Sequence, residues 1–320
     1  MKSDLFFGVD IGGTKIAAAL VDENGKILSR EKYSTPEKAA PKEILENLVK
    51  LLYETLDKEH AAKNTVKGIG IGIPGIVDGE KNKIVATPNI NLAGFPLAQE
   101  VEKEFGAKTV LGNDVNLGLL GEQWLGCAKG ARNVVGIFPG TGVGGAIIIN
   151  GKIYLGAKGA AAEIGHMIIE ANGPDCSCGN RGCLEALASR WAIERDIRHA
   201  IKKGEKTIVT ELTDGDLSRI KSKILKKALE EKDPLVTQVM EKAARALGAG
   251  CVSLIHLLNP ELIVLGGGVI EACGDFILPI VRKAVSSDPF FSKFDDCKIV
   301  ESKLADDAVI LGAVALAKEI

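Results

Sequence analysis

Residues 5–34 read LFFGVDIGGTKIAAALVDENGKILSREKYS. Residues 5–10 and 14–21 are mostly apolar, which predicts two buried strands joined by the glycine turn Asp10-Ile-Gly-Gly-Thr-Lys15. Asn24-Gly25 then predicts a tight turn into a third strand at 27–33. The chain is therefore expected to open with a three-stranded meander.

The same pattern returns in the second half of the chain. Strands are predicted at 133–138, 146–149 and 152–155, with Gly140-Thr-Gly-Val-Gly-Gly145 after the first and Asn150-Gly151 before the third. The other predicted strands are 66–73, 108–112, 261–265 and 297–302, and the predicted helices are 42–60, 115–125, 184–203, 215–231, 234–257, 270–285 and 307–318. The repeat implies two related α/β lobes of mixed sheet flanked by helices, with a cleft between them.

The chain of 320 residues exceeds the size at which a single core usually stops growing, which favours two lobes. We expect a smaller N-terminal α/β lobe at 1–115, with the C-terminal helix at about 307–320 packing back on it. The larger lobe is expected at 116–306 and contains a cysteine cluster described below.

Composition limits the classes of partner. Forty basic and 42 acidic residues give a formal charge of -2, and no long run of one sign occurs, which argues against nucleic acid and anionic membranes. Apolar runs are too short to span a bilayer, and the N-terminus lacks the features of a signal peptide. Seven cysteines, an odd number, indicate reduced thiols or a metal site. We therefore expect a cytoplasmic protein with a small-molecule partner.

Three glycine-rich turns lie at strand ends. The turns at 10–15 and 140–145 occupy equivalent places in the two meanders, and Leu265-Gly-Gly-Gly-Val269 separates a strand from a helix. A single Gly-Gly-Thr sequence could also be an ordinary hairpin turn that binds no ligand. Three such turns favour phosphate binding, because glycine backbone angles allow sharp turns that leave amide groups facing outward. The spacing matches neither the Walker nor the Rossmann motif.

A carboxylate is expected beside these turns. Leu111-Gly-Asn-Asp-Val-Asn116 places Asn113 and Asp114 at the carboxyl end of a strand, where ligands commonly bind in α/β sheets. Phosphoryl transfer to a hydroxyl group needs a carboxylate to accept the proton. The alternative interpretation of Asp114 is a helix N-cap.

Four residues have the spacing of a metal site. His166, Cys176, Cys178 and Cys183 form the arrangement His-x₉-Cys-x-Cys-x₄-Cys, with Gly179 and Gly182 allowing the chain to fold tightly. Three thiolates and one imidazole complete a tetrahedral Zn²⁺ site without an open position, which predicts a structural ion. The alternative is a cluster of reduced surface cysteines. The cysteines without such spacing are Cys127, Cys251, Cys273 and Cys297.

With these motifs the chain resembles the ROK sugar kinases of the actin-like ATPase superfamily, and most closely their bacterial glucokinases. The similarity runs from Asp10 almost to the C-terminus, and the family's zinc motif matches Cys176 to Glu185 residue for residue. The resemblance implies two actin-like, ribonuclease H-like lobes with an interlobe cleft. It also implies phosphorylation of glucose to glucose 6-phosphate by ATP with Mg²⁺, in glycolysis, with Asp114 as general base.

The resemblance also assigns binding residues. The implied ATP-binding residues are Asp10, Gly12, Gly13, Thr14, Lys15, Gly140, Thr141, Gly142, Gly144, Gly266, Gly267 and Gly268, of which Asp10 would organise Mg²⁺ through water. The implied sugar-binding residues are Gly75, Asn89, Asn113, Asp114, Glu163, His166 and Glu185. His166 would bind zinc through one ring nitrogen and a sugar hydroxyl through the other. Family members are often dimers or tetramers, so a homo-oligomer is expected.

Several alternatives stay open. Relatives often carry a bulky residue where this chain reads Asn91-Leu-Ala-Gly-Phe95, so fructose, mannose, N-acetylglucosamine and N-acetylmannosamine remain candidate substrates. Polyphosphate or ADP could replace ATP as donor. A sugar-sensing repressor would need a DNA-reading module, for which no room is expected ahead of Asp10. A motion-driving ATPase would not need the sugar-binding residues.

Overall fold

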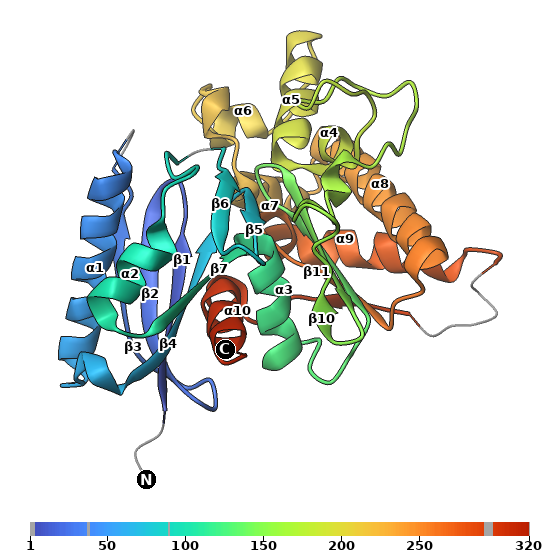
Figure 1. The fold of residues 1–320 in the computed structure, drawn as a ribbon. Helices are drawn as coiled ribbons and strands as arrows, with labels where there is room; N and C mark the ends of the chain where they lie inside the picture. Colours follow the sequence, from blue (N-terminus) through green and yellow to red (C-terminus); the bar gives the residue numbers. More distant parts are fainter. Residues whose placement is uncertain (1–3, 37–38, 89, 291–296, 320) are drawn as a thin grey trace. The chain divides into compact units, whose positions relative to one another are not determined.

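The computed structural model describes residues 4–36, 39–88, 90–290 and 297–319 (Figure 1). The chain forms two compact units. The first takes in the described residues up to Ala131, Ile147–Ala162 and those from Asp306 onward, and the second contains Arg132–Ala146 and Glu163–Ala305. The first unit thus extends beyond the expected boundary at residue 115, and the C-terminal helix belongs to it.

The first sheet has the strand order β3-β2-β1-β4-β7. Its strands are β1 (Leu5–Ile11), β2 (Lys15–Asp22), β3 (Ile27–Ser34), β4 (Val66–Ile73) and β7 (Lys108–Asn113). The predicted meander of β1, β2 and β3 is antiparallel, whereas β1 pairs with β4, and β4 with β7, in parallel. A separate hairpin joins β5 (Ile76–Asp78) and β6 (Lys83–Ala86).

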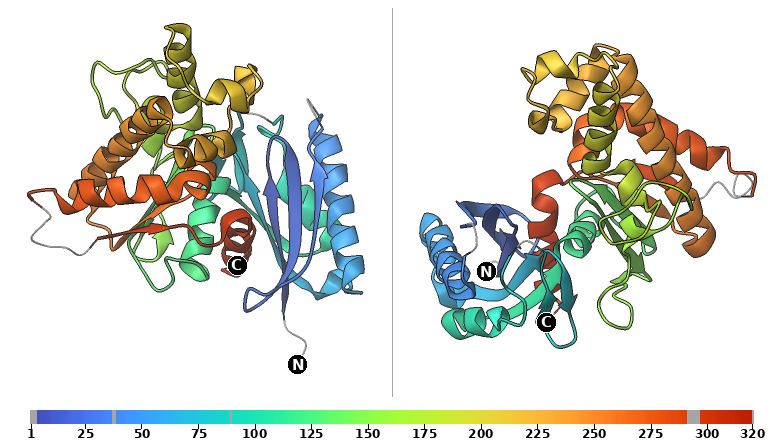
Figure 2. Two further views of the ribbon diagram at one scale, coloured as in Figure 1. Left: turned by 180° about the vertical axis from the view of Figure 1, so that it is seen from behind. Right: turned by 90° about the horizontal axis from the view of Figure 1, so that it is seen from above.

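Helices cover both faces of this sheet. The views in Figures 1 and 2 show α1 (Pro41–Lys58) and α2 (Leu97–Phe105) on one face, and α10 (Ala308–Ala317) on the other. Helix α3 (Asp114–Trp124) packs along α10. The apolar stripe of α1 has the spacing of one helix face, which is why it is buried; its residues are Ile44, Leu48, Leu51, Leu52 and Leu56.

Glycines let α10 approach the sheet at backbone distance. A Cβ atom on Gly8 of β1 would overlap the carbonyl oxygen of Ile310, and one on Gly70 of β4 would overlap that of Ala313. Helix α3 makes the same kind of contact, since a Cβ on Gly121 would overlap the carbonyl oxygen of Ala308. The C-terminal helix is therefore seated on small residues of the first unit.

The second sheet repeats the order of the first, as β10-β9-β8-β11-β12. Its strands are β8 (Val134–Pro139), β9 (Val143–Ile149), β10 (Lys152–Ile153), β11 (Leu262–Leu265) and β12 (Lys298–Glu301). Strand β9 pairs with β10 antiparallel, whereas β11 pairs with β8 and β12 in parallel. The mixed sheets flanked by helices that the repeat predicted are confirmed.

The second unit carries more helix than the first. Its helices are α4 (Leu184–Ala188), α5 (Arg190–Lys202), α6 (Val209–Leu212), α7 (Ser222–Glu230), α8 (Pro234–Leu258) and α9 (Gly268–Ser286). Helix α8 packs against α9 and α4, and α9 also contacts β8 and β12. Within the described part of the chain, no helix combines the length and apolar character that a membrane crossing requires.

Two predicted helices were wrong in their extent. The helix predicted at 184–203 is broken at Ser189, which has extended backbone angles (φ -71°, ψ 160°) and accepts the Ala192 N–H with its side chain at 3.1 Å. The helix predicted at 215–231 is a short 3₁₀ turn at Leu217–Arg219 followed by α7. Helix α2 and the β5–β6 hairpin were not predicted.

Gly121→Ala should lower the free energy of unfolding by about 1–3 kcal/mol, because the added methyl overpacks the contact between α3 and α10. Urea denaturation measures this loss. Gly118→Ala is the matched control: it lies one turn earlier on α3, and its Cβ would first meet Val309 Cγ2 at 3.9 Å, an ordinary contact. Alanine there should stabilise the helix by up to about 1 kcal/mol. Equal effects of the two variants would contradict the packing argument.

Candidate functional site

The carboxyl ends of three parallel strands meet at one edge of the first sheet. Asp10 on β1 lies opposite Gly72 on β4, and Gly72 lies opposite Gly112 on β7. Asn113 ends β7 and Asp114 begins α3. This edge is where α/β sheets commonly bind ligands, and the structure brings Asp10 and Asp114 together there.

Asn113, and not Asp114, is the N-cap of α3. The Asn113 side chain accepts the Asn116 N–H at 3.0 Å through Oδ1, and donates through Nδ2 to the Gly75 carbonyl at 2.9 Å. Asp114 Oδ1 accepts the Val115 N–H at 2.9 Å and the Asn113 amide at 3.1 Å. Among the described residues no hydrogen bond to Asp114 Oδ2 is found. The alternative interpretation of Asp114 as the N-cap of this helix is therefore wrong.

Burial makes both carboxylates more basic than usual. Burial raises the pKa of Asp10 from 3.8 to about 6, the Asp114 carboxylate adds to the rise, and the Lys15 ammonium opposes it. Burial likewise raises the pKa of Asp114, although the Val115 N–H opposes that rise. A carboxylate with a raised pKa is a better proton acceptor near neutral pH.

The first glycine turn joins β1 and β2. The Gly12 N–H donates to the Lys15 carbonyl at 2.8 Å, and the Thr35 hydroxyl donates to the Gly12 carbonyl at 2.7 Å. Gly13, Thr14 and Lys15 are exposed. The Lys15 ammonium lies 3.4 Å from Asp306. Asp306 was not singled out from the sequence, because nothing local places residue 306 beside residue 15.

The second glycine turn joins β8 and β9 and is held by the segment from α4 to α5. The Arg190 N–H donates to the Gly140 carbonyl at 2.9 Å, and the Val143 N–H donates to Glu185 Oε2 at 2.9 Å. A Cβ on Gly142 would overlap Glu185 Oε2, so a side chain at this position would displace the glutamate carboxylate. The Glu185 carboxylate thus lies against the turn in this structure.

Of the glycines predicted to bind ATP, only one, in the third turn, has a positive φ. Gly267, the N-cap of α9, has a φ of 78°. None of Gly12, Gly13, Gly140, Gly142 and Gly144 has a positive φ, so the first two turns form without left-handed backbone angles at these glycines. A Cβ on Gly140 or Gly268 would meet nothing within 4 Å, so both backbones have open space beside them.

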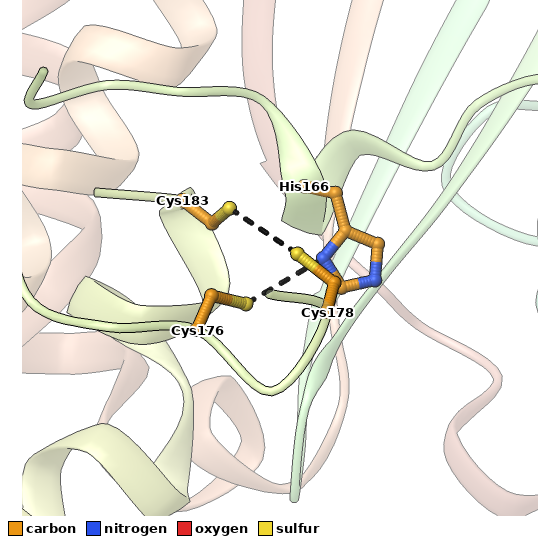
Figure 3. A group of neighbouring side chains, drawn as sticks. All are labelled: His166, Cys176, Cys178 and Cys183. Carbon is orange, nitrogen blue, oxygen red and sulfur yellow. Dashed lines mark hydrogen bonds between the residues drawn. The ribbon is translucent and has the colours of Figure 1, made fainter. Parts of the chain in front are cut away.

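His166, Cys176, Cys178 and Cys183 come together in the second unit, as Figure 3 shows. Their ligand atoms all lie within 4.8 Å of one another. The tight loop between the cysteines is closed by the Cys176 N–H, which donates to the Asn180 carbonyl at 2.8 Å. Gly182 (φ 69°) has no room for a side chain beside the Glu170 carbonyl. The spacing read from the sequence therefore corresponds to one point in space.

The geometry of this cluster fits a tetrahedral zinc ion. The Cys178 and Cys183 sulfurs are 3.7 Å apart, and the Cys176 sulfur is 3.7 Å from His166 Nδ1. Bonds of about 2.3 Å to sulfur in a tetrahedron separate two sulfurs by about 3.8 Å. Each residue offers one ligand atom, which would fill the four positions.

The residues predicted to bind sugar are distributed over both units. Gly75, Asn113 and Asp114 belong to the first unit, where the Asn113 amide links the other two. Glu163, His166 and Glu185 belong to the second, where the backbone N–H of His166 donates to the backbone carbonyl of Glu163 at 3.0 Å. Asn89, the remaining predicted residue, lies outside the described residues.

Comparison with known proteins gives a family match over nearly the whole chain. The model of the ROK family matches residues 6–320. The glucokinase of Thermotoga maritima is 35% identical over 98% of this chain and 96% of its own length. The xylose repressor of Caldicellulosiruptor bescii is 32% identical over 97% of this chain and 77% of its own length. Among solved structures, a ROK family glucokinase from Streptomyces griseus in complex with glucose and AMPPNP has a TM-score of 0.80 and 33% identity, covering 99% of this chain and 100% of its own.

We expect the purified protein to carry about one zinc ion per chain, and Cys178→Ser to lose it. Because structural zinc contributes to folding, the variant should also unfold at a lower temperature. Elemental analysis and calorimetry measure the two effects. Cys297→Ser, which lies outside the cluster, is the control and should keep its zinc. Wild-type protein that is free of zinc after growth with zinc would contradict the site.

Asp10→Asn should stabilise the protein when Mg²⁺ is absent. The folded-state pKa of about 6 exceeds the ordinary value of 3.8, so ionisation of Asp10 destabilises the fold as pH rises from about 4 to above 6. At pH 8 the free energy of unfolding of the variant should exceed that of the wild type by about 1–3 kcal/mol.

Below pH 3.8 this difference should vanish, because Asp10 is then largely neutral in the unfolded chain as well as in the fold. Denaturation in EDTA across this pH range makes the measurement. Asp275→Asn, an exposed position on α9, is the control. A constant advantage of Asp10→Asn at every pH would contradict the role of ionisation.

Proposed function

The chain belongs to the ROK family, and on that premise we propose that it is an ATP-dependent hexose kinase that converts glucose to glucose 6-phosphate. The observation that carries the proposal is Asp114: a half-buried carboxylate with a raised pKa, released from capping by Asn113, at the carboxyl edge of the first sheet. Such a group is suited to accept a proton from a hydroxyl nucleophile.

Similar proteins support the donor and the substrate class. The relative from Thermotoga maritima is named a glucokinase, and the Streptomyces griseus glucokinase structure holds glucose and AMPPNP. Both similarities extend over nearly the full length of this chain, so a sugar kinase is well supported. Glucose as the preferred hexose is the more specific part of the proposal.

The proposed chemistry is proton removal coupled to phosphoryl transfer. Asp114 accepts the proton of the sugar hydroxyl while the hydroxyl oxygen attacks the terminal phosphorus of ATP. The bond between that phosphorus and the bridging oxygen breaks, and ADP leaves with that oxygen. Asn113 keeps the Asp114 side chain in place through its amide, and the start of α3 fixes the backbone. Positioning of this kind supplies a large part of the rate enhancement.

Asp10 is the proposed partner of Mg²⁺. Its carboxylate lies at the end of β1 beside Asp114, and burial and the Asp114 carboxylate raise its pKa although the Lys15 ammonium opposes the rise, so a bound divalent cation would stabilise its ionised form. When bound, Mg²⁺ would screen the charge of the transferred phosphoryl group. The exposed ends of the first turn, Gly13 to Lys15, and the open backbone at Gly140 and Gly268 are proposed to receive the nucleotide.

The zinc cluster is proposed to organise the sugar-binding side of the second unit. Its four protein ligands leave no place for substrate on the ion, which makes the zinc structural. His166 and Glu185 are tied to the cluster by ligation and by sequence proximity, so the ion would fix both side chains.

We further propose that the protein is a cytoplasmic homo-oligomer with a role in glycolysis.

A sugar-sensing regulator is the main rival, because the family also contains repressors. Repression needs sugar binding without phosphoryl transfer, so it does not require Asp10, the residue proposed for Mg²⁺, whereas Asp114 could still bind sugar. Turnover separates the two functions directly.

Release of ADP should be strongest with glucose when ATP, Mg²⁺ and glucose, mannose, fructose, N-acetylglucosamine or N-acetylmannosamine are supplied, and negligible without sugar. Asp114→Asn should lower kcat by about 10²–10⁴-fold, because it removes the base but keeps an oxygen to accept the Val115 N–H. Glucose binding to the variant, measured by calorimetry, should be retained.

The outcomes divide the alternatives. Preference for another sugar would correct the substrate, and activity only with polyphosphate or ADP would correct the donor. ATP hydrolysis independent of sugar would indicate a different class of ATPase. Glucose binding without turnover under any donor would indicate a regulator, and an active Asp114→Asn would remove Asp114 from the role of base.

A further inference from the structure

The second glycine turn, Gly140–Gly145, contains no charged residue, whereas the first turn carries Lys15. The only acid so far placed against it is Glu185, which accepts the Val143 N–H. A turn that binds a polyanion benefits from a cation, since neutral amides alone leave the phosphate charge uncompensated. The question is which residue of the second unit supplies that charge.

Arg190, the first residue of α5, lies directly on this turn. Its Nη2 donates to the Thr141 hydroxyl at 2.8 Å, and its backbone N–H donates to the Gly140 carbonyl at 2.9 Å. Its Nε lies 3.2 Å from Glu194, one turn further along the helix. Among the described residues no partner of Nη1 is found, so the guanidinium keeps donors to offer.

The surroundings of Arg190 suit phosphate binding. The side chain is 31% exposed, and Thr141 is exposed at the tip of the turn. The beginning of the 13-residue helix α5 adds the positive end of its dipole at the same place. A planar guanidinium can hold one hydroxyl and still donate to phosphate oxygens, which a lysine ammonium does with less directional precision.

We propose that Arg190 binds the terminal phosphate of a nucleoside triphosphate at the second glycine turn while it positions Thr141. The inference rests on the proposed kinase function. Arg190 would then provide the positive charge at the second turn, as Lys15 does at the first turn. The serine before it, Ser189, caps α5 and so fixes where the arginine begins the helix.

Binding of Mg²⁺ complexes of AMPPNP and ADP, and of AMP, tests this role by calorimetry. Arg190→Ala should weaken AMPPNP binding about 10-fold or more and AMP binding less than about 2-fold, because only the longer nucleotide reaches the guanidinium. Arg190→Lys should recover part of the loss. In turnover, the KM for ATP should rise by a similar factor, and the KM for hexose should stay within about 2-fold.

Two further variants separate phosphate binding from support of the turn. Arg198→Ala is the matched control: it lies on α5, pairs with the same Glu194 at 3.1 Å, and is 34% exposed. It should leave nucleotide binding unchanged. Thr141→Val removes the hydroxyl that Arg190 holds but keeps the cation, so it should cost less AMPPNP affinity than Arg190→Ala.

Three results would overturn the inference: equal losses for AMPPNP and AMP, a loss in Arg198→Ala as large as in Arg190→Ala, or a loss in Thr141→Val that equals that of Arg190→Ala. The last would mean that Arg190 acts only through Thr141. Wild-type protein that binds no nucleotide would refute the kinase proposal together with the inference. Wild-type binding that Arg190→Ala leaves intact would refute the inference alone.

Discussion

The first unit depends on the contact between the backbone of α10 and the glycines of its sheet. Gly8 and Gly70 leave no gap between β1, β4 and the carbonyl groups of Ile310 and Ala313. Because interiors are closely packed, this contact fixes the height of the helix above the strands that end at the predicted catalytic edge. Asp306, the partner of Lys15, stands just before α10 and is placed by the same contact. The contact between α10 and the sheet therefore determines both the packing of the strands and the position of the Asp306 charge beside Lys15.

Local sequence signals were sufficient for most of the fold. The strand pattern around Asn24-Gly25 and its recurrence around Asn150-Gly151 predicted two meanders, and the structure has both with the same strand order. Errors arose where tertiary contacts or capping overrode periodicity. Ser189 interrupts an otherwise helical pattern because its side chain caps a new helix, and nothing in the apolar spacing distinguishes that break from a continuous helix.

The candidate site was predictable as a set of residues but not as a set of contacts. Spacing was enough to predict that the four candidate zinc ligands lie together, because a short loop with Gly179 and Gly182 restricts where the sulfurs can lie. The contacts of Arg190 and Asp306 join positions remote in sequence and have no local signature. The close neighbour of Gly142 was likewise not evident from the sequence: its φ is not positive, and the Glu185 carboxylate that lies against it is more than forty positions away.

The discontinuity of the first unit has a consequence for synthesis on the ribosome. Its sheet is translated early, but the helix that covers Gly8 and Gly70 emerges only after the whole second unit. At roughly 5–20 residues per second, residues 132–307 take on the order of 10–35 s to make. During that interval the glycine face of the sheet is open to water or to other chains. Chaperones are therefore expected to be most useful to the nascent chain between synthesis of the first sheet and emergence of α10 from the exit tunnel.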